Sequence, residues 1–154
     1  YYAGVQYAQK KFALGGSGWK GYSFKPAQYS IDSWNHIAMV VEDEYVKFYL
    51  NGQLIEKASR SYAKISEPFN HALWLGALNN ASVASDFFTG LIDNVQIWDR
   101  ALSERELYRS MALPPTENLE GLVASYDFSS VKGKWVKNLA NGQFDLKLVD
   151  DIEI

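Results

Sequence analysis

The sequence predicts an all-β protein, an antiparallel jelly-roll β-sandwich with one short helix. Three observations favour this fold class. Hydrophobic residues make up 47% of the chain and aromatic residues 15%, which suits half-buried pleated strands. Short apolar segments recur along the chain and are separated by turn residues. One of them, Tyr45 to Leu50, alternates between two faces, as expected of a sheet with one buried side.

Composition and charge indicate how many domains to expect and which kinds of partner are not expected. The 154 residues and their hydrophobic fraction predict a single domain, residues 1–154, with its own core. The formal net charge of −3 gives no basic field for a phosphate backbone, so nucleic acid is not an expected partner. No apolar stretch approaches the roughly 20 residues that cross a bilayer, so membrane insertion is not expected either.

The first thirty residues are predicted to hold two strands around the glycine-rich turn "GGSGWKG". The turn is not a phosphate-binding loop. Such a loop has Ser or Thr after its lysine, whereas Lys20 is followed by Gly21.

The next segment, "WNHIAMVVEDEYVKFYLNGQLIEKA", predicts a meander of three antiparallel strands. The expected strands are Trp34 to Val41, Tyr45 to Leu50, and Gln53 to Lys57. Asn51 and Gly52 join the last two, and this pair favours a type I′ turn because both positions need positive φ.

The rest of the chain alternates short strands with one helix. Ser103 and Glu106 form a capping box, which predicts a helix that begins at Glu104 and ends before Pro114. The expected strands are Ala72 to Leu75, which a polar Asn/Ser/Asp loop follows, then Leu91 to Trp98, Leu122 to Phe128, Trp135 to Leu139, and Phe144 to Val149.

Asp93 stands out within "GLIDNVQIWDRALSERELYRS". Strand alternation places Asp93 on the same face as Leu91, Val95 and Ile97. A carboxylate on an apolar face needs a partner, because an isolated buried charge is very costly. The partner is either backbone amide groups, an Arg or Lys side chain, or a cation.

Several motifs resemble a known family. "WNHIAMVV", "YVKFYLNGQLI", "LWLGAL" and "FTGLIDNVQIWDRALSERELY" follow one another as in laminin-G-like domains of the concanavalin A-like jelly-roll superfamily, which includes the pentraxins. The resemblance covers roughly Trp34 to Tyr108. It implies a non-catalytic module that binds glycans or proteins, often beside calcium.

The order of two further motifs departs from that family. Such domains usually open with a strand similar to "GLVAYYDF" and a following "N-G-x-x-L" segment, but here Gly121 to Phe128 and Asn141 to Leu146 come last. Residues 121–154 therefore either complete the same domain in permuted order or begin a second repeat. The first alternative is favoured, because the first and last strands of the family's fold lie side by side.

The resemblance also bears on metal binding. Pentraxin-like calcium sites use acidic and amide side chains just after the "LG" strand, where Ala77 and Leu78 stand here, so that site is not expected. Jelly-roll glucanases hold a structural Ca²⁺ through an Asp of the strand similar to "GLIDNVQIW". That resemblance implies Asp93 as a metal ligand.

Catalytic residues are not expected. Glycoside hydrolysis needs two facing carboxylates, whereas Glu42, Asp43 and Glu44 are consecutive and lie on a predicted turn. The chain's two histidines lie beside no nucleophile motif.

Residues for glycan binding are present. Trp19 and Tyr22 offer aromatic faces for sugar C–H groups, and the later loop offers polar groups for hydroxyls at Asn79, Asn80 and Asp86. The alternative is that the aromatics are core residues and the Asn-rich segment is only a turn.

The sequence thus predicts a non-catalytic, lectin-like module that binds glycans within a larger secreted or cell-surface protein. The alternative is a protein-protein adhesion or spacer module without a sugar site. The expected partners are a glycan or a surface protein, together with neighbouring domains of the same chain.

Overall fold

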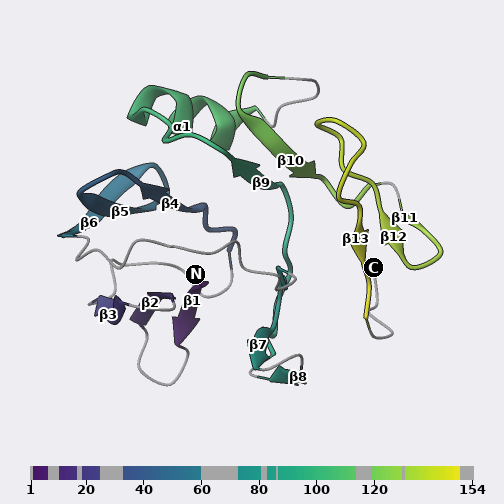
Figure 1. Cartoon of the computed structure of the whole chain (residues 1–154), viewed down its shortest axis with the longest axis horizontal. Helices are drawn as coiled ribbons and strands as arrows, with labels where there is room; N and C mark the ends of the chain where they lie inside the picture. The colour runs from purple at the N-terminus through teal and green to yellow at the C-terminus, as the bar shows by residue number, and fades with distance from the viewer. Residues whose placement is uncertain are drawn as a thin grey trace. The chain divides into compact units, whose positions relative to one another are not determined.

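The structure is a computed structural model that describes residues 2–6, 11–16, 19–24, 33–59, 73–80, 83–85, 87–113, 119–129 and 131–149 (Figure 1). In residues 2–6, 11–16, 19–24, 78–80 and 83–85 the backbone alone is described. The described residues are mostly β-strand with one short helix, as predicted. Its two units, Tyr1–Thr89 and Gly90–Ile154, are described separately.

The first sheet of the N-terminal unit contains β1 (Tyr2–Gln6), β2 (Lys11–Gly16) and β3 (Trp19–Phe24). All neighbours are antiparallel, in the order β1-β2-β3. The glycine-rich segment joins β2 to β3, which confirms the two predicted strands on either side of it.

The second sheet of this unit is the predicted meander. It contains β4 (Ile37–Val41), β5 (Tyr45–Leu50) and β6 (Gln53–Ser59), antiparallel and in that order. The β5–β6 turn has φ 50° at Asn51 and φ 78° at Gly52, the positive values that a type I′ turn requires. The strand predicted from Trp34 begins only at Ile37.

The buried face of β5 carries the core of this sheet, as the alternation predicted. Val46, Phe48 and Leu50 are all buried. Tyr49 is buried as well, although the alternation assigned it to the other face. A register shift between Phe48 and Tyr49 in the β5–β6 pairing interrupts the regular alternation there.

A hairpin of β7 (Leu78–Asn80) and β8 (Val83–Ser85) follows. It replaces the polar loop that the sequence predicted. The strand predicted at Ala72 to Leu75 is wrong for its described part, because residues 73 and 74 have no regular structure and residues 75–77 form bends.

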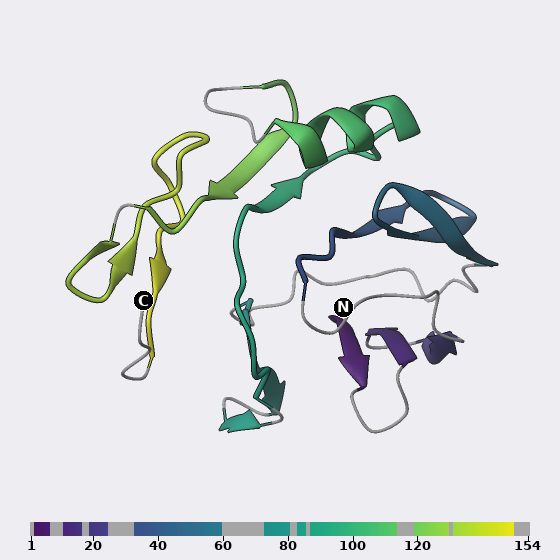
Figure 2. The ribbon, with the colours of Figure 1, turned by 180° about the vertical axis from the view of Figure 1, so that it is seen from behind.

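The C-terminal unit contains two sheets and the helix. Strands β9 (Val95–Trp98) and β10 (Leu122–Tyr126) form an antiparallel pair, seen side by side in Figures 1 and 2. A three-stranded antiparallel sheet contains β11 (Val131–Lys132), β12 (Trp135–Val136) and β13 (Leu146–Lys147).

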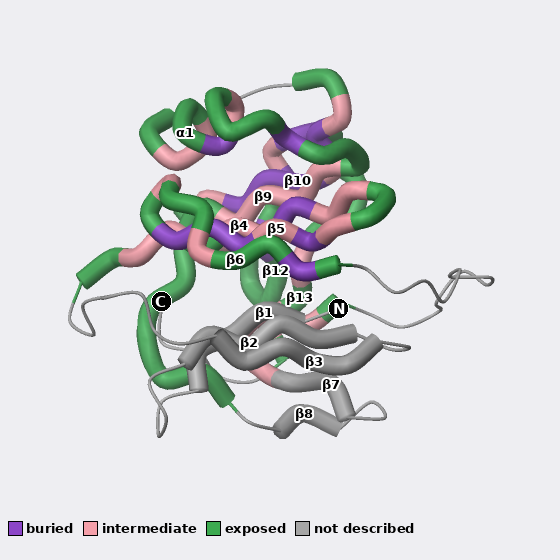
Figure 3. Tube along the Cα trace, turned by 90° about the vertical axis from the view of Figure 1, so that its left-hand side faces the viewer, coloured by how far each residue is buried: buried purple, intermediate pink, exposed green. Residues whose placement is uncertain are grey.

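The strands of this unit are shorter than predicted. Left-handed residues explain the late start of β9 and the early end of β10. Asn94 has φ 52°, so the extended strand begins only after it, at Val95. Phe128 has φ 53°, and β10 ends before it. The buried core of this unit includes Ala124, Tyr126 and Val136, and Figure 3 shows buried residues along β10.

Helix α1 (Glu104–Ala112) begins at the predicted residue and stops short of Pro114. The capping box is formed. Glu106 N–H donates to Ser103 Oγ at 3.3 Å, and Ser103 N–H donates to Glu106 Oε2 at 2.8 Å. Leu102 and Leu107, which flank the cap in the positions of a hydrophobic staple, are both buried.

The cap makes stability depend on pH. Hydrogen bonds from Arg100 first, and then from Ser103, lower the pKa of Glu106 from 4.5 to about 2. A carboxyl whose folded pKa is depressed stabilises the fold fully above its unfolded pKa and loses this effect as pH falls through the folded value. We therefore expect Glu106→Gln to lower Tm at neutral pH and the difference from wild type to shrink between pH 4.5 and 2.

Thermal melts of both proteins across this range check the prediction. Glu104→Gln, in the same turn, controls for the loss of a negative charge at a helix N-terminus. A Tm difference that stays constant from neutral pH down to pH 2 would contradict it.

Candidate functional site

The register of the first sheet bears directly on the predicted aromatic pair. Tyr22 lies opposite Leu14, and Trp19 lies opposite Gly16. One residue separates the two β2 partners, but two residues separate Trp19 from Tyr22, so β3 contains a bulge. Residues 14 and 16 share a face of the sheet, and their cross-strand partners share it with them.

The bulge therefore places positions 19 and 22 on one face. In a regular strand, residues three apart lie on opposite faces. The partner of Trp19 is a glycine, which has no side chain to occupy the neighbouring cross-strand position.

The predicted amide residues are placed differently. Asn79 and Asn80 are consecutive in β7 and pair with Ala84 and Val83 of β8, so they lie on opposite faces of the hairpin. Asp86 lies outside the described residues. Of the five predicted ligand-binding residues, the register thus brings Trp19 and Tyr22 to one face and separates Asn79 from Asn80.

Asp93 is not on a buried face, and this expectation was wrong. Its side chain is exposed, and it precedes the strand that begins at Val95. Its Oδ1 accepts a hydrogen bond from Asn94 N–H at 2.8 Å. The partner of this carboxylate is therefore a backbone amide, where Asn94 turns the chain into the left-handed region.

The acidic segment after β4 forms a turn, as predicted. Glu42 accepts a hydrogen bond from Lys47 Nζ at 2.6 Å, and its N–H donates to Tyr45 O at 2.8 Å, closing the hairpin. In the described ranges, no three or more His, Asp or Glu residues gather in a group that could hold a metal ion.

His36 directly precedes β4, at one end of the β4–β5–β6 sheet. Its N–H donates to Asn51 Oδ1 at 2.8 Å, and its carbonyl accepts from Asn51 N–H at 2.8 Å. Burial lowers the pKa of His36 below its ordinary value, so the imidazole is neutral at neutral pH. His71 lies outside the described residues.

An exposed tryptophan of the C-terminal unit was missed from the sequence. Trp135 lies between Lys132 and Lys147 in the three-stranded sheet of the C-terminal unit. The signal was present in "VKGKW", because a glycine at a two-residue turn fixes which residues of the hairpin face each other.

Among the described residues, no helix is long and apolar enough to cross a membrane.

Comparison with known proteins gives two findings. Residues 2–107 match the family model described as the concanavalin A-like lectin/glucanases superfamily. Among solved structures, the chain is similar to an S-layer domain-containing protein (residues 221–444) from Clostridium thermocellum ATCC 27405, with 22% identity and a TM-score of 0.47. The match covers 64% of this chain and 49% of that one, so the chain spans about half the length of that structure. A likeness this distant assigns no function.

Proposed function

The chain belongs to the concanavalin A-like lectin/glucanase superfamily, whose family model matches residues 2–107, and on this basis we propose that it is a non-catalytic, lectin-like module that binds glycans. Its place is within a larger secreted or cell-surface protein. The sugar site is on the β2–β3 face at Trp19 and Tyr22.

The observation that carries the proposal is the bulge in β3. It assigns positions 19 and 22, a tryptophan and a tyrosine, to the same face of the β2–β3 pair, with Gly16 opposite Trp19. Aromatic faces of this kind pack against the C–H surfaces of sugar rings. Asn79, Asn80 and Asp86 remain predicted polar contacts to hydroxyl groups.

The acidic residues support a binding rather than a catalytic role. A glycosidase needs a carboxyl group that stays protonated and a second carboxylate across a cleft. Glu42 instead pairs with Lys47 beside a turn, and Asp93 is hydrogen-bonded to its neighbouring amide. Neither arrangement provides a proton donor aimed at a substrate.

A glycan array tests the proposed function. The intact chain should bind a subset of neutral glycans, because stacking does not require ligand charge. An array on which the folded chain binds nothing would contradict the lectin proposal. Binding to a surface protein instead would support the adhesion alternative, which the exposed Phe87 and Phe88 favour.

We also propose that residues 121–154 complete the same domain. β10 pairs with β9 along Leu122 to Tyr126, and its side chains contribute to the core of the C-terminal unit. This pairing supports the permuted arrangement, in which the last segment supplies a strand that such domains usually place first.

A structural Ca²⁺ at Asp93 is a separate proposal, which rests on the family resemblance. The described residues fit such an ion in part. Asp93 supplies one exposed carboxylate, and the remaining oxygens of a six- to eight-coordinate site would come from backbone carbonyls. The ion would stabilise the turn before β9.

Chelation tests this. If Asp93 holds Ca²⁺, EDTA should lower Tm for the wild type, added Ca²⁺ should restore it, and Asp93→Asn should weaken both responses. A wild-type Tm that EDTA leaves unchanged would contradict the metal proposal and leave Asp93 as a cap for Asn94 alone. Glu120→Gln, another exposed carboxylate in the same unit, is the matched control.

A further inference from the structure

The three-stranded sheet of the C-terminal unit has two chemically different faces. Its register aligns Lys132 with Trp135 and Trp135 with Lys147. The adjacent row aligns Val131 with Val136 and Val136 with Leu146. Directly opposed residues of antiparallel strands share a face, so one face is cationic and aromatic and the other is aliphatic.

The aliphatic face fixes the sheet in place. Val136 is 1% exposed and packs in one core with Ala124 and Tyr126, while Val131 and Leu146 contact the edge of that core. Leu148 N–H donates to Lys134 O at 2.8 Å, which extends the pairing of β12 with β13. The turn between β11 and β12 begins at Gly133, whose φ of 60° suits a tight hairpin.

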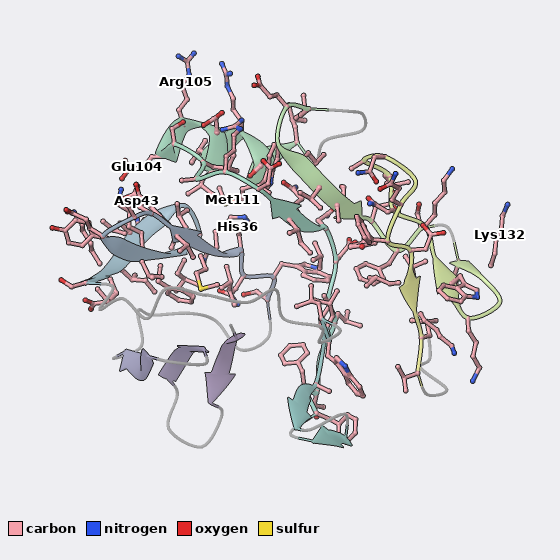
Figure 4. All side chains as sticks on the ribbon, in the orientation of Figure 1. His36, Asp43, Glu104, Arg105, Met111 and Lys132 are labelled. Carbon is pink, nitrogen blue, oxygen red and sulfur yellow. The ribbon has the colours of Figure 1, made fainter. Side chains whose placement is uncertain are left out.

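The opposite face is open. Trp135 is 50% exposed, although an indole of this size is usually placed where its ring is covered. Lys132 and Lys147 are exposed on either side of it, and Figure 4 shows Lys132 projecting away from the β11–β12 hairpin. Among the side chains that the structure describes, neither of these two lysines forms an ion pair.

We propose that this Lys132–Trp135–Lys147 row is a binding site for acidic polysaccharides. The indole face would pack against the C–H surface of one sugar ring, and the two ammonium groups would bind carboxylate or sulfate groups on either side of it. Neighbouring strands lie about 4.8 Å apart, so the row spans about 10 Å across the three strands. That span is comparable with a disaccharide unit.

Charge complementarity favours an anionic glycan over other polyanions. The chain as a whole has a net charge of −3, so long-range attraction to a duplex or an anionic membrane is weak. Recognition must instead come from local geometry, in which one aromatic face lies between two cations. A polymer of sugar rings with regularly spaced charges matches this geometry, whereas an acidic polypeptide offers no ring face.

The site is distinct from the proposed glycan site on β2–β3 and does not depend on it. Neutral glycans would bind at Trp19 and Tyr22 without electrostatic help. Acidic polymers would bind at the Lys132–Trp135–Lys147 row with strong dependence on salt. Failure of one proposal therefore leaves the other standing.

Affinity electrophoresis of the full chain against immobilised polymers tests the inference. Polygalacturonate and dextran sulfate supply carboxylate and sulfate groups, and neutral dextran, polyglutamate and duplex DNA are the comparison ligands. The wild type should bind both acidic polysaccharides, and this binding should weaken as salt increases. Equal binding to neutral dextran, polyglutamate or DNA would overturn the proposal.

Variants locate the site. Trp135→Ala should weaken binding to the acidic polysaccharides about tenfold or more, the scale of losing one stacked aromatic contact, and Trp135→Phe should retain most of the affinity. The double variant Lys132→Ala/Lys147→Ala should weaken it to a similar extent. Trp19→Ala/Tyr22→Ala should leave it unchanged.

Lys47→Ala/Lys57→Ala is the matched control, because these lysines are also directly opposed on neighbouring strands and their loss changes the net charge equally. Thermal melts confirm that each variant is folded. If a folded Trp135→Ala binds like the wild type, or if the control loses as much affinity as Lys132→Ala/Lys147→Ala, the inference is wrong.

Discussion

Replacing Asn138 with alanine should lower the free energy of unfolding of the C-terminal unit by about 3–5 kcal/mol, since it leaves several buried groups without partners at about 1–3 kcal/mol each. Asn138 is 0% exposed. Its Oδ1 accepts hydrogen bonds from Ser125 N–H at 2.9 Å and from Ala140 N–H at 3.0 Å. Its Nδ2 donates to Val123 O at 3.1 Å and to Gln143 O at 2.6 Å.

The position of Asn138 explains the size of the effect. One side chain uses its full donor and acceptor capacity to join β10 to the loop before β13. Its own N–H donates to Asp145 Oδ1 at 2.8 Å, which fixes the backbone as well. The network is buried, so water cannot replace the lost bonds without opening the core.

Urea denaturation of wild type and Asn138→Ala measures this loss. The matched control is Asn141→Ala, because Asn141 belongs to the same network but is exposed, and water can satisfy its partners. We expect the control to cost about 1 kcal/mol or less, within the range of a single hydrogen bond. Equal losses in the two variants would contradict the assigned role of Asn138.

Replacing Phe48 with alanine should have an effect of similar size in the N-terminal unit, about 3–5 kcal/mol, because the change removes a large buried ring and leaves a cavity. Phe48 is 0% exposed at the centre of the β4–β5–β6 sheet, where it lies opposite Met39 and Glu56. The strand itself should persist, since its backbone pairing does not involve the ring.

Denaturant melts monitored by far-UV circular dichroism check this prediction. Phe87→Ala is the control, because Phe87 belongs to the same unit and is 64% exposed. Its removal should change stability by no more than about 0.5 kcal/mol, as for most surface substitutions. A Phe48→Ala variant as stable as Phe87→Ala would show that β5 does not carry the core of this sheet.

The elements that sequence predicted well are those specified by local signals. Asn51 and Gly52 require positive φ and so determine the turn and the register of β5 with β6. Ser103 and Glu106 satisfy each other's backbone N–H groups, and the helix begins where this pair indicates. Neither result depends on distant parts of the chain.

The errors have a different physical origin. The face of Asp93 was assigned on the assumption that the backbone is extended from Leu91 to Ile97. Asn94, between Asp93 and the first residue of β9, is left-handed, so the alternation of β9 does not extend back to Asp93.

The strand expected at Phe144 to Val149 begins only at Leu146, after the left-handed Phe144 with φ 60°. The strand expected at Trp135 to Leu139 ends at Val136, ahead of Asn138, whose side chain accepts a hydrogen bond from Ser125 N–H of β10. Such long-range partners cannot be identified from the spacing of residues in one segment.

The candidate site was predictable by residue type but not by geometry. Aromatic and amide groups indicated glycan chemistry, yet the bulge that places positions 19 and 22 on one face comes only from the register of β2 with β3. The Lys132–Trp135–Lys147 row was missed for the same reason, since Lys147 is far from the hairpin in sequence and joins it only through β13.

The most direct test of the central claim is the affinity of Trp19→Ala/Tyr22→Ala for the neutral glycan that the wild type binds most tightly. We expect a loss of about tenfold or more, on the scale of losing stacked aromatic contacts. Tyr108→Ala, which removes an exposed ring from the helix, should bind like the wild type. A folded Trp19→Ala/Tyr22→Ala variant with unchanged affinity would contradict the assignment of the sugar site to this face.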